Sequence, residues 1–367
     1  MSKRKVSDDR RGDCAGKRLK QAKQHLYLLL DDWERGSVRK LDVDTFDSDA
    51  GTDLLQPRHF TEPPVARIEA LHEISCSFIS QGTKIFAMQP REGKPAIPTF
   101  DTHALGLTIC LWPSCRGDYV NRPLFASIAG RLFLFTDVLA EALGDPPPYD
   151  SKAPWSWTTI KARPPFFTGR VLCHALHPDG RTLFVSAGSR SRQRNCEDSP
   201  EQAGQSTFSF DAERLRWRHH GDWVLPFSGE AYFDAELEAL CGERNGDGCF
   251  CACDVAPVAA EFTSAPAWKL GQGRLFRKGP QLHLGAKLLY MGDSKFCLVE
   301  SVLYKEGDDR LCPWPRRRVL RMTTFGLKYN KKGELRTKLR RAGACRVYKR
   351  PHDFGESLDR CPWAFWL

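Results

Sequence analysis

Short apolar runs, each introduced by a glycine, recur along the chain about every fifty residues. They begin at Gly82, Gly130, Gly180 and Gly285, with steps of 48, 50 and 105 residues, the last step corresponding to two units. The missing unit falls at residues 231–240, which carry the apolar pattern without the glycine. A period of roughly 40–50 residues made of strands is typical of β-propeller blades of the WD40 or kelch type. The pattern therefore predicts the fold of the protein more directly than its function.

Each unit predicts four short strands. The second unit has apolar runs at 74–79, 82–88 and 97–101 and a last run that reaches Trp112; the fourth has runs at 172–176, 180–186, 207–211 and 214–217. In both units a Phe-Asp pair, at 100–101 and 210–211, precedes a tryptophan. An aspartate can bond its own backbone two residues on, so we expect it to begin a turn. Trp112, Trp217 and, in the fifth unit, Trp268 offer the large apolar faces that pack one blade on the next.

The whole pattern predicts one all-β domain. Strands are expected at 26–31 and 37–43, and residues 52–67, which contain three prolines, are interpreted as a linker. We predict a single kelch-like β-propeller over residues 25–350, with about six four-stranded blades, five to seven remaining open. The N-terminal strands and a late C-terminal strand should share one blade, because this closure removes exposed sheet edges.

Two segments outside the repeats are expected to be irregular. Residues 1–24 are polar and lack apolar periodicity, which predicts a disordered basic arm. Residues 351–367 do not follow the repeat pattern and are interpreted as an irregular C-terminal tail.

Several stretches resemble a plant family, abundant in grasses, that is catalogued as a domain of unknown function, number 1668. The resemblance covers residues 25–350 and implies a kelch-like β-propeller with no assigned biochemical activity. The motifs that carry it are strand and turn segments rather than catalytic signatures. They are Tyr27-Leu-Leu-Leu-Asp-Asp-Trp33, His177-Pro-Asp-Gly-Arg-Thr182, His220-Gly-Asp-Trp-Val-Leu-Pro-Phe227, Tyr290-Met-Gly-Asp293 and Thr323-Thr-Phe-Gly-Leu-Lys-Tyr329.

Composition limits the location and the class of partner. No apolar segment follows the charged N-terminus, and the longest early apolar run, residues 26–30, is far shorter than the roughly 20 residues of a membrane span. We therefore expect a nuclear or cytoplasmic protein that is not secreted, whose 14 cysteines are free thiols. The net charge of +10 is uneven: residues 1–25 carry +6, residues 316–350 carry +13, and the rest carries −9. This distribution does not indicate a uniformly basic nucleic-acid binder.

No catalytic or metal-binding motif emerges, and we predict no catalytic residue, no metal and no cofactor. The run Cys249-Phe-Cys-Ala-Cys253, with Cys241 nearby, does not have zinc spacing, and we expect it to fill the narrow inner end of a blade. His174, His177, His219 and His220 lie within one repeat and are interpreted as turn and packing residues. The chain contains neither a nucleophile elbow nor a P-loop.

Two basic clusters are candidate interaction sites. The first resembles a two-part nuclear import signal, with a solubilising tail as the alternative; it consists of Arg4, Lys5, Lys17, Arg18 and Lys20. The second would form a basic patch if strand alternation places its side chains on one surface; it consists of Arg316, Arg317, Arg318, Lys331, Lys332, Arg340 and Arg341. For the second cluster we favour docking onto the acidic body of the same chain or a solvated face over an interaction patch.

Three function classes follow. We expect first a monomeric, non-enzymatic module that binds a protein through loops on one propeller face. The second class is an enzyme with a site in the central channel, oxidase-like by analogy with kelch-type oxidases. It requires inward-pointing histidine, tyrosine or carboxylate side chains near the axis. The third is a nuclear or anionic-ligand binder that uses the basic segments, with nucleic acid disfavoured as a partner.

Overall fold

The computed structural model describes residues 23–32, 36–46, 57–68, 77–88, 96–114, 123–148, 150–189, 204–244, 248–259, 264–276, 283–303, 317–349 and 362–367. Within these residues the regular structure is β-strand, apart from one short 3₁₀ turn, η1 (Val43–Thr45). None of them forms a helix with the length and apolar character of a membrane span.

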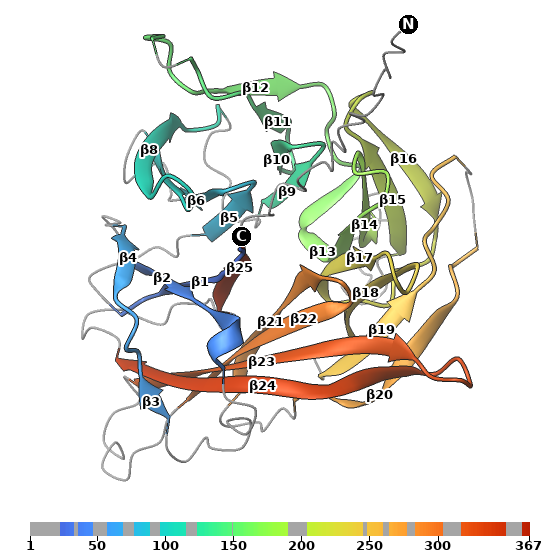
Figure 1. Ribbon diagram of the computed structural model, residues 1–367. Coiled ribbons are helices and arrows are strands. Elements are labelled where there is room, and N and C mark those ends of the chain that lie inside the picture. Colours follow the sequence, from blue (N-terminus) through green and yellow to red (C-terminus); the bar gives the residue numbers. More distant parts are fainter. Residues whose placement is uncertain are drawn as a thin grey trace, which may run out of the picture.

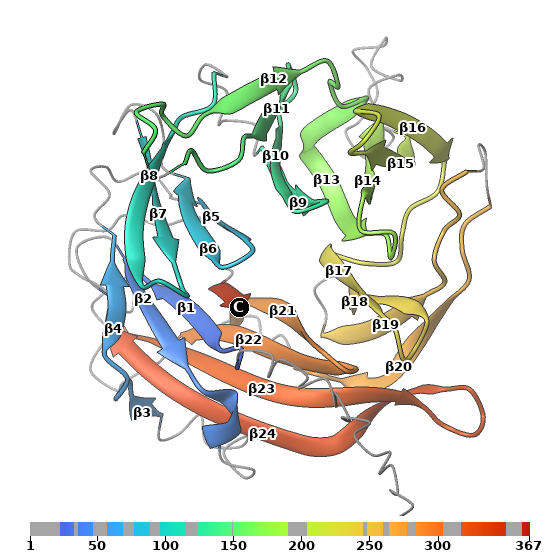
Figure 2. The same ribbon diagram turned by 45° about the horizontal axis from the view of Figure 1, so that its top comes forward.

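The strands form six four-stranded blades around a central axis (Figures 1 and 2). From the axis outward, blade 1 contains β25 (Trp363–Trp366), β1 (Leu26–Leu30), β2 (Ser37–Leu41) and β4 (Pro64–Arg67). Blade 2 contains β5 (Ser77–Gln81), β6 (Lys84–Met88), β7 (Ala96–Asp101) and β8 (Gly106–Leu111). Blade 3 contains β9 (Leu124–Ile128), β10 (Arg131–Phe135), β11 (Ala140–Leu143) and β12 (Trp157–Ile160).

The remaining three blades follow the same order. Blade 4 contains β13 (Phe166–Leu176), β14 (Thr182–Ser189), β15 (Gln205–Asp211) and β16 (Arg216–Gly221). Blade 5 contains β17 (Gly229–Asp234), β18 (Ala239–Arg244), β19 (Cys249–Cys253) and β20 (Trp268–Arg274). Its innermost strand β17 pairs in parallel with β13, so blades 4 and 5 share one eight-stranded sheet. Blade 6 contains β21 (His283–Gly292), β22 (Lys295–Leu303), β23 (Arg317–Tyr329) and β24 (Leu335–Lys349), with β3 (Arg58–His59) added parallel to β24. The prediction of an all-β propeller with about six four-stranded blades is confirmed.

Both ends of the chain contribute to blade 1. Strand β25 pairs antiparallel with β1, with Phe365 opposite Tyr27. His25 and Leu367 exchange two backbone hydrogen bonds, of 2.8 and 3.1 Å. The expectation of an irregular tail over residues 351–367 is wrong for residues 363–366, because this segment completes the hydrogen-bonding edge of β1 and buries Phe365. The linker expected at residues 52–67 likewise contains two short strands, β3 and β4.

The turn between the first two strands of blades 2 to 6 explains the sequence repeat. Gly82, Gly130 and Gly180 adopt positive φ angles of 55°, 72° and 70° in these turns, a conformation that glycine reaches without steric cost. In blade 5 Glu238 takes this position with φ of 51°, which is why the glycine is missing there. Gly285 does not belong to this set: it lies inside β21, and the turn of blade 6 follows at residues 292–295.

The aspartates of the Phe-Asp pairs begin turns as expected. The carboxylate of Asp101 accepts hydrogen bonds from the backbone N–H groups of residues 103 and 104, at 2.9 and 3.2 Å. Asp211 makes the same bonds to residues 213 and 214, at 2.9 and 3.0 Å. The side chain therefore satisfies backbone donors that the turn leaves unpaired.

Two of the three predicted tryptophans pack between blades. Trp217 packs edge-to-face against Phe135 in blade 3 and Phe166 in its own blade, with ring centroids 5.1 and 5.0 Å apart. Trp112 belongs to the apolar cluster that joins blades 2 and 3. The interpretation of Trp268 was wrong: it lies on the outer strand of blade 5, is 42% exposed and is covered by the guanidinium of Arg244.

Candidate functional site

The basic residues singled out from the sequence do not gather into one described patch. Arg317 and Arg318 begin β23, whereas Lys331 and Lys332 lie in the turn between β23 and β24. Strand β23 has 13 residues, so at about 3.3 Å per residue the two pairs are roughly 40 Å apart. Arg340 and Arg341 lie in β24, between the two ends of the hairpin. The residues that fall outside the described part of the chain are Arg4, Lys5, Lys17, Arg18, Lys20 and Arg316.

Part of this positive charge is directed onto blade 1. Arg318 Nη1 lies 3.8 Å from Asp31 Oδ2, and Arg346 Nη2 lies 3.3 Å from Glu62 Oε1. The hydroxyl of Tyr348 also donates to Asp31, at 2.9 Å. These contacts join blade 6 to blade 1. Arg318 and Arg346 therefore help to hold the two ends of the propeller together, with side chains that are 13% and 17% exposed.

The cysteine run lies in β19, the third strand of blade 5, and not at the inner end of the blade as expected. Cys251 and Cys253 pack against Cys173 of blade 4, whereas Cys241 packs with the apolar cluster on the side of blade 6. Burial is the main cause that raises the pKa of Cys251 and of Cys253 to about 12. Within the described ranges no three His, Cys, Asp or Glu side chains are grouped so that they could hold a metal ion.

Three of the four histidines of the fourth unit have turn and packing contacts. The Nδ1 atom of His177 accepts a hydrogen bond from the backbone N–H of Asp179, at 3.2 Å. The Nε2 atom of the buried His220 lies 2.8 Å from Ser209 Oγ. His219 packs its ring on Phe208, with centroids 5.2 Å apart.

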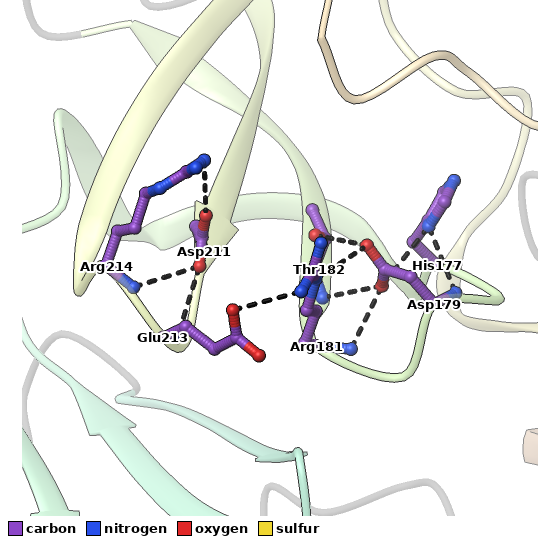
Figure 3. A network of polar contacts seen from close by, with 7 residues as sticks. All are labelled: His177, Asp179, Arg181, Thr182, Asp211, Glu213 and Arg214. Carbon is purple, nitrogen blue, oxygen red and sulfur yellow. Dashed lines mark hydrogen bonds and ion pairs between the residues drawn. The ribbon is translucent and has the colours of Figure 1, made fainter.

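A polar network at the edge of blade 4 joins two turns (Figure 3). The carboxylate of Asp179 accepts hydrogen bonds from the backbone N–H groups of Arg181 and Thr182, both at 2.9 Å, and from the Thr182 hydroxyl at 2.7 Å. Arg181 then extends to Glu213, in the turn between β15 and β16, with a 3.0 Å ion pair. The network stabilises the two turns, and its partners satisfy one another.

His174 lies instead in a cavity on the propeller axis. The cavity has a volume of about 700 Å³ and is lined by the innermost strand of every blade, namely β5, β9, β13, β17, β21 and β25. This volume lies within the range of roughly 300–1,000 Å³ that is usual for small-molecule sites. Much of the wall is aromatic or aliphatic, with a few hydroxyl and amide groups from β5 and β9.

Four polar side chains meet on one side of this cavity. His174 on β13 lies opposite Glu230 on the parallel strand β17, and Lys287 on β21 extends to the same carboxylate. Lys287 Nζ lies 2.9 Å from Glu230 Oε2, with exposed fractions of 31% and 39% for the two side chains. Tyr232, two residues after Glu230 and therefore on the same face of β17, donates its hydroxyl to Glu230 Oε2 at 2.9 Å.

The surroundings set the protonation of this cluster. Burial acts to raise the pKa of Glu230, but the positive charges of Lys287 and of protonated His174, with the hydrogen bonds from Lys287 and Tyr232, lower it to about 2. Burial is the main cause that lowers the pKa of His174 below its ordinary value. Burial and the adjacent Glu230 charge raise the pKa of Tyr232 well above its ordinary value.

Glu230 and Tyr232 therefore provide a fixed charge and a hydrogen bond rather than proton donors tuned to neutral pH. Glu230 stays ionised and Tyr232 stays protonated across the physiological range. General acid or base catalysis is most efficient when the pKa lies near the working pH. Among the described residues that line the cavity, Lys287 and Glu230 are the only lysine, arginine, aspartate or glutamate side chains, so the two charges cancel.

The sequence analysis missed Glu230, Tyr232 and Lys287, and it placed His174 among the packing residues. One signal was present in the sequence: His174, Glu230 and Lys287 follow one another by 56 and 57 residues, close to one repeat. Equivalent positions in successive units fall at the same level of neighbouring innermost strands. An alignment of the repeats, rather than a search for local motifs, brings these residues together.

The fold and the cavity define a six-bladed β-propeller with a polar cluster on its axis. The chain belongs to the family described as Protein of unknown function (DUF1668), which matches residues 23–346. The resemblance stated from the sequence is therefore confirmed as membership of this family. No curated protein matches the sequence.

Solved structures with some similarity share little sequence with this chain. A nidogen/laminin complex matches at 10% identity and a TM-score of 0.41, covering 90% of this chain and 100% of the other. The periplasmic gluconolactonase PpgL of Pseudomonas aeruginosa matches at 12% identity and a TM-score of 0.39, covering 89% and 99%. A protein of unknown function from Bacteroides thetaiotaomicron matches at 11% identity and a TM-score of 0.40, covering 86% and 78%. None of these values supports a transfer of activity.

Proposed function

We propose that this protein is a non-enzymatic binding module whose axial cavity holds a small, net-neutral polar molecule. The observation that carries the proposal is the cluster of His174, Glu230, Tyr232 and Lys287 in a cavity of about 700 Å³. Convergent polar groups in a largely apolar pocket are the usual sign of a ligand site.

The charge balance of the cavity supports a net-neutral ligand. A lone anion that engaged Lys287 would compete with Glu230 and leave the carboxylate without its cation. Removing one partner of a buried ion pair costs about 3–5 kcal/mol, and less where the pair is partly exposed, as here. A zwitterion or a neutral polyol can bond to both Lys287 and Glu230. Neither side chain then loses the opposite charge that balances its own.

The same geometry bears on the enzyme hypothesis. That hypothesis required histidine, tyrosine and carboxylate groups that point to the axis, and Glu230, Tyr232 and His174 meet this condition. The pKa of Glu230, about 2, and the raised pKa of Tyr232 make these two groups poor proton acceptors and donors near neutral pH, which leaves His174 as the group that the enzyme hypothesis would need. We therefore retain the non-enzymatic class and move the expected site from the face loops to the axis.

Other parts of the sequence-based hypothesis stay predictions. They are the plant origin and the kelch type of the repeat, both implied by the family resemblance, the nuclear or cytoplasmic location, and the monomeric state. A role as anionic-ligand binder has less support than the cavity, because Arg318 and Arg346 engage acidic residues of blade 1.

Ligand-induced stabilisation tests the proposal directly. The full chain is titrated with L-glutamine as a zwitterion, myo-inositol as a neutral polyol, citrate as an anion and spermidine as a cation, and the melting temperature is followed. A ligand that binds the folded state stabilises it by about 2.7 kcal/mol at a hundred times its Kd. We expect stabilisation by a net-neutral probe and none by citrate or spermidine; the reverse pattern, or no effect of either neutral probe, contradicts the proposal.

Two variants locate the binding. Lys287→Met removes the cation of the cavity, and we expect it to weaken binding of the stabilising probe at least tenfold. Lys84→Met is the matched control, because Lys84 forms a 2.6 Å ion pair with Asp101 in blade 2, away from the cavity. Equal loss of binding in both variants would indicate a general effect on the fold.

A further inference from the structure

The outer strand of blade 2 exposes a row of apolar side chains. Leu107, Ile109 and Leu111 alternate along β8 and are 61%, 65% and 40% exposed, and Leu105 in the preceding turn is 59% exposed. Cys110, on the other face of the strand, is 1% exposed and packs in the cluster that joins blades 2 and 3. We call Leu105, Leu107, Ile109 and Leu111 the β8 ridge.

Within the part of the chain that the structure describes, the outer edge of β8 also presents main-chain groups that bond to no other residue. The backbone N–H of Leu111 donates to Trp155 O at 2.8 Å, and Leu111 O accepts from Trp157 Nε1 at 3.0 Å, so both groups point away from β7. Because antiparallel strands alternate with period two, the N–H and C=O groups of Ile109 and Leu107 point the same way. The residue of β7 opposite Ile109 is Pro98. Pro98 has no N–H to donate, which agrees with a pair that exchanges no main-chain hydrogen bonds. No described residue bonds to these groups of Leu107 or Ile109.

The other outer strands of the described propeller are protected in ways that β8 is not. Strand β4 has four residues and contains a proline and an arginine. Strand β12 also lacks a charge and a proline, but it has only four residues and exposes two threonines instead of a row of apolar side chains. Strand β16 carries two arginines and two histidines. In β20, Trp268 is covered by the guanidinium of Arg244 from β18. Strand β24 is paired with β3. Charges, prolines and covering segments are the usual means of preventing edge pairing, and the sequence of β8, Gly-Leu-Thr-Ile-Cys-Leu, contains neither a charge nor a proline.

We propose that β8 is a docking edge for an extended, uncharged segment of a partner protein, which adds as a fifth strand to blade 2. Main-chain hydrogen bonds to Leu107 and Ile109 would provide affinity, and alternate apolar side chains on the β8 ridge would provide selectivity. Trp155 and Trp157 already bond to the outward groups of Leu111, so the incoming segment pairs with the remaining edge at Leu107 and Ile109. This site lies on the rim of the propeller and is independent of the axial cavity.

The size of the ridge favours a single strand over a second copy of the chain. A stable interface between globular proteins uses about 20–30 residues on each side, whereas the β8 ridge has four. Strand addition needs only one edge and a few side-chain contacts. The absence of charge on β8 further selects a segment that is itself uncharged where it pairs.

A synthetic peptide tests this inference on the full chain. The probe has seven residues, with valine at alternate positions, threonine between them and one solubilising lysine at each end. Binding is measured by fluorescence anisotropy against two N-methylated versions, one methylated on the edge that would face β8 and one methylated on the opposite edge. We expect the first version to bind at least tenfold more weakly than the parent peptide and the second to bind equally well.

Ile109→Pro is the matching change in the protein. It removes a donor that points away from β7, so the sheet of blade 2 keeps its hydrogen bonds, and we expect at least tenfold weaker peptide binding with an unchanged melting temperature. Leu270→Lys, at a 45% exposed position of β20, is the control and should leave binding unchanged. If Ile109→Pro does not fold, the methylated peptides still decide the question on the unmodified protein.

Three results would overturn the inference. The first is no binding of the parent peptide at millimolar concentration. The second is equal binding of the two methylated peptides, which would show that main-chain pairing is not involved. The third is a dimer in sedimentation equilibrium that Ile109→Pro dissociates, which would assign the edge to a second copy of this chain.

Discussion

Replacing Phe365 by alanine tests whether the C-terminal strand is a structural part of the propeller. Phe365 is 8% exposed and packs in a cluster that joins blades 1 and 2, which includes Tyr27, Val38 and Ile85. Burial of a phenylalanine side chain contributes about 2 kcal/mol, and the void left by its removal adds about 1 kcal/mol or more. We therefore expect the variant to lose about 3 kcal/mol of unfolding free energy.

The assay is urea unfolding followed by tryptophan fluorescence, with the midpoint and slope compared between variant and wild type. Val138→Ala is the control, because Val138 is 60% exposed and surface truncations of this kind change stability by less than about 0.5 kcal/mol. A loss for Phe365→Ala that matches this control would refute the argument that β25 is packed into blade 1. It would also remove β25 from the wall of the axial cavity.

Three further predictions concern the cavity, the turns and the thiols. The pKa of Glu230 is lowered to about 2 from its ordinary value of 4.5, so the stability from its pairing is present above pH 4.5 and lost as pH falls toward 2. The stability difference between wild type and Lys287→Met, measured by urea unfolding, should therefore shrink over that range; a constant difference would contradict the pairing. Asp211→Ala removes the acceptor of two backbone N–H groups and should cost about 1–2 kcal/mol by the same assay, with Asp211→Asn closer to wild type. Because burial raises the pKa of Cys251 and Cys253 to about 12, both thiols should resist a disulfide reagent at pH 8 until the protein unfolds; mass spectrometry that finds them labelled in the folded state would argue against their burial.

The repeat could be predicted because a few turn positions have strict backbone requirements. Gly82, Gly130 and Gly180 recur where φ is positive, and a glycine signal survives in the sequence even when the strands around it vary. The recurring glycine is lost where another residue type adopts the same positive φ angle. Glu238 takes this conformation in blade 5, and Gly285 falls by coincidence near the repeat distance inside a strand.

The C-terminal strand and the basic patch could not be predicted from local sequence. Trp363–Trp366 is four residues long and pairs with β1, more than 330 positions earlier, so no local pattern marks it as the inner strand of blade 1. A count of charges also could not reveal that Arg318 and Arg346 face acids near the other end of the chain. Both features have one cause, because closure of the propeller brings together segments from the two ends of the chain.

The axial cavity unites residues that the chain keeps far apart, and this arrangement explains why the fold suits a binding role. Every innermost strand contributes residues to the wall, so the six strands build a pocket without any long motif. The polar cluster lies on β13, β17 and β21, inside the residues that match the family, whereas β25 lies beyond residue 346. The charge preference of the cavity is thus set by one part of the chain and the shape of its opposite wall by another. Substitutions in β25 can change which molecule fits while the ion pair between Lys287 and Glu230 stays intact.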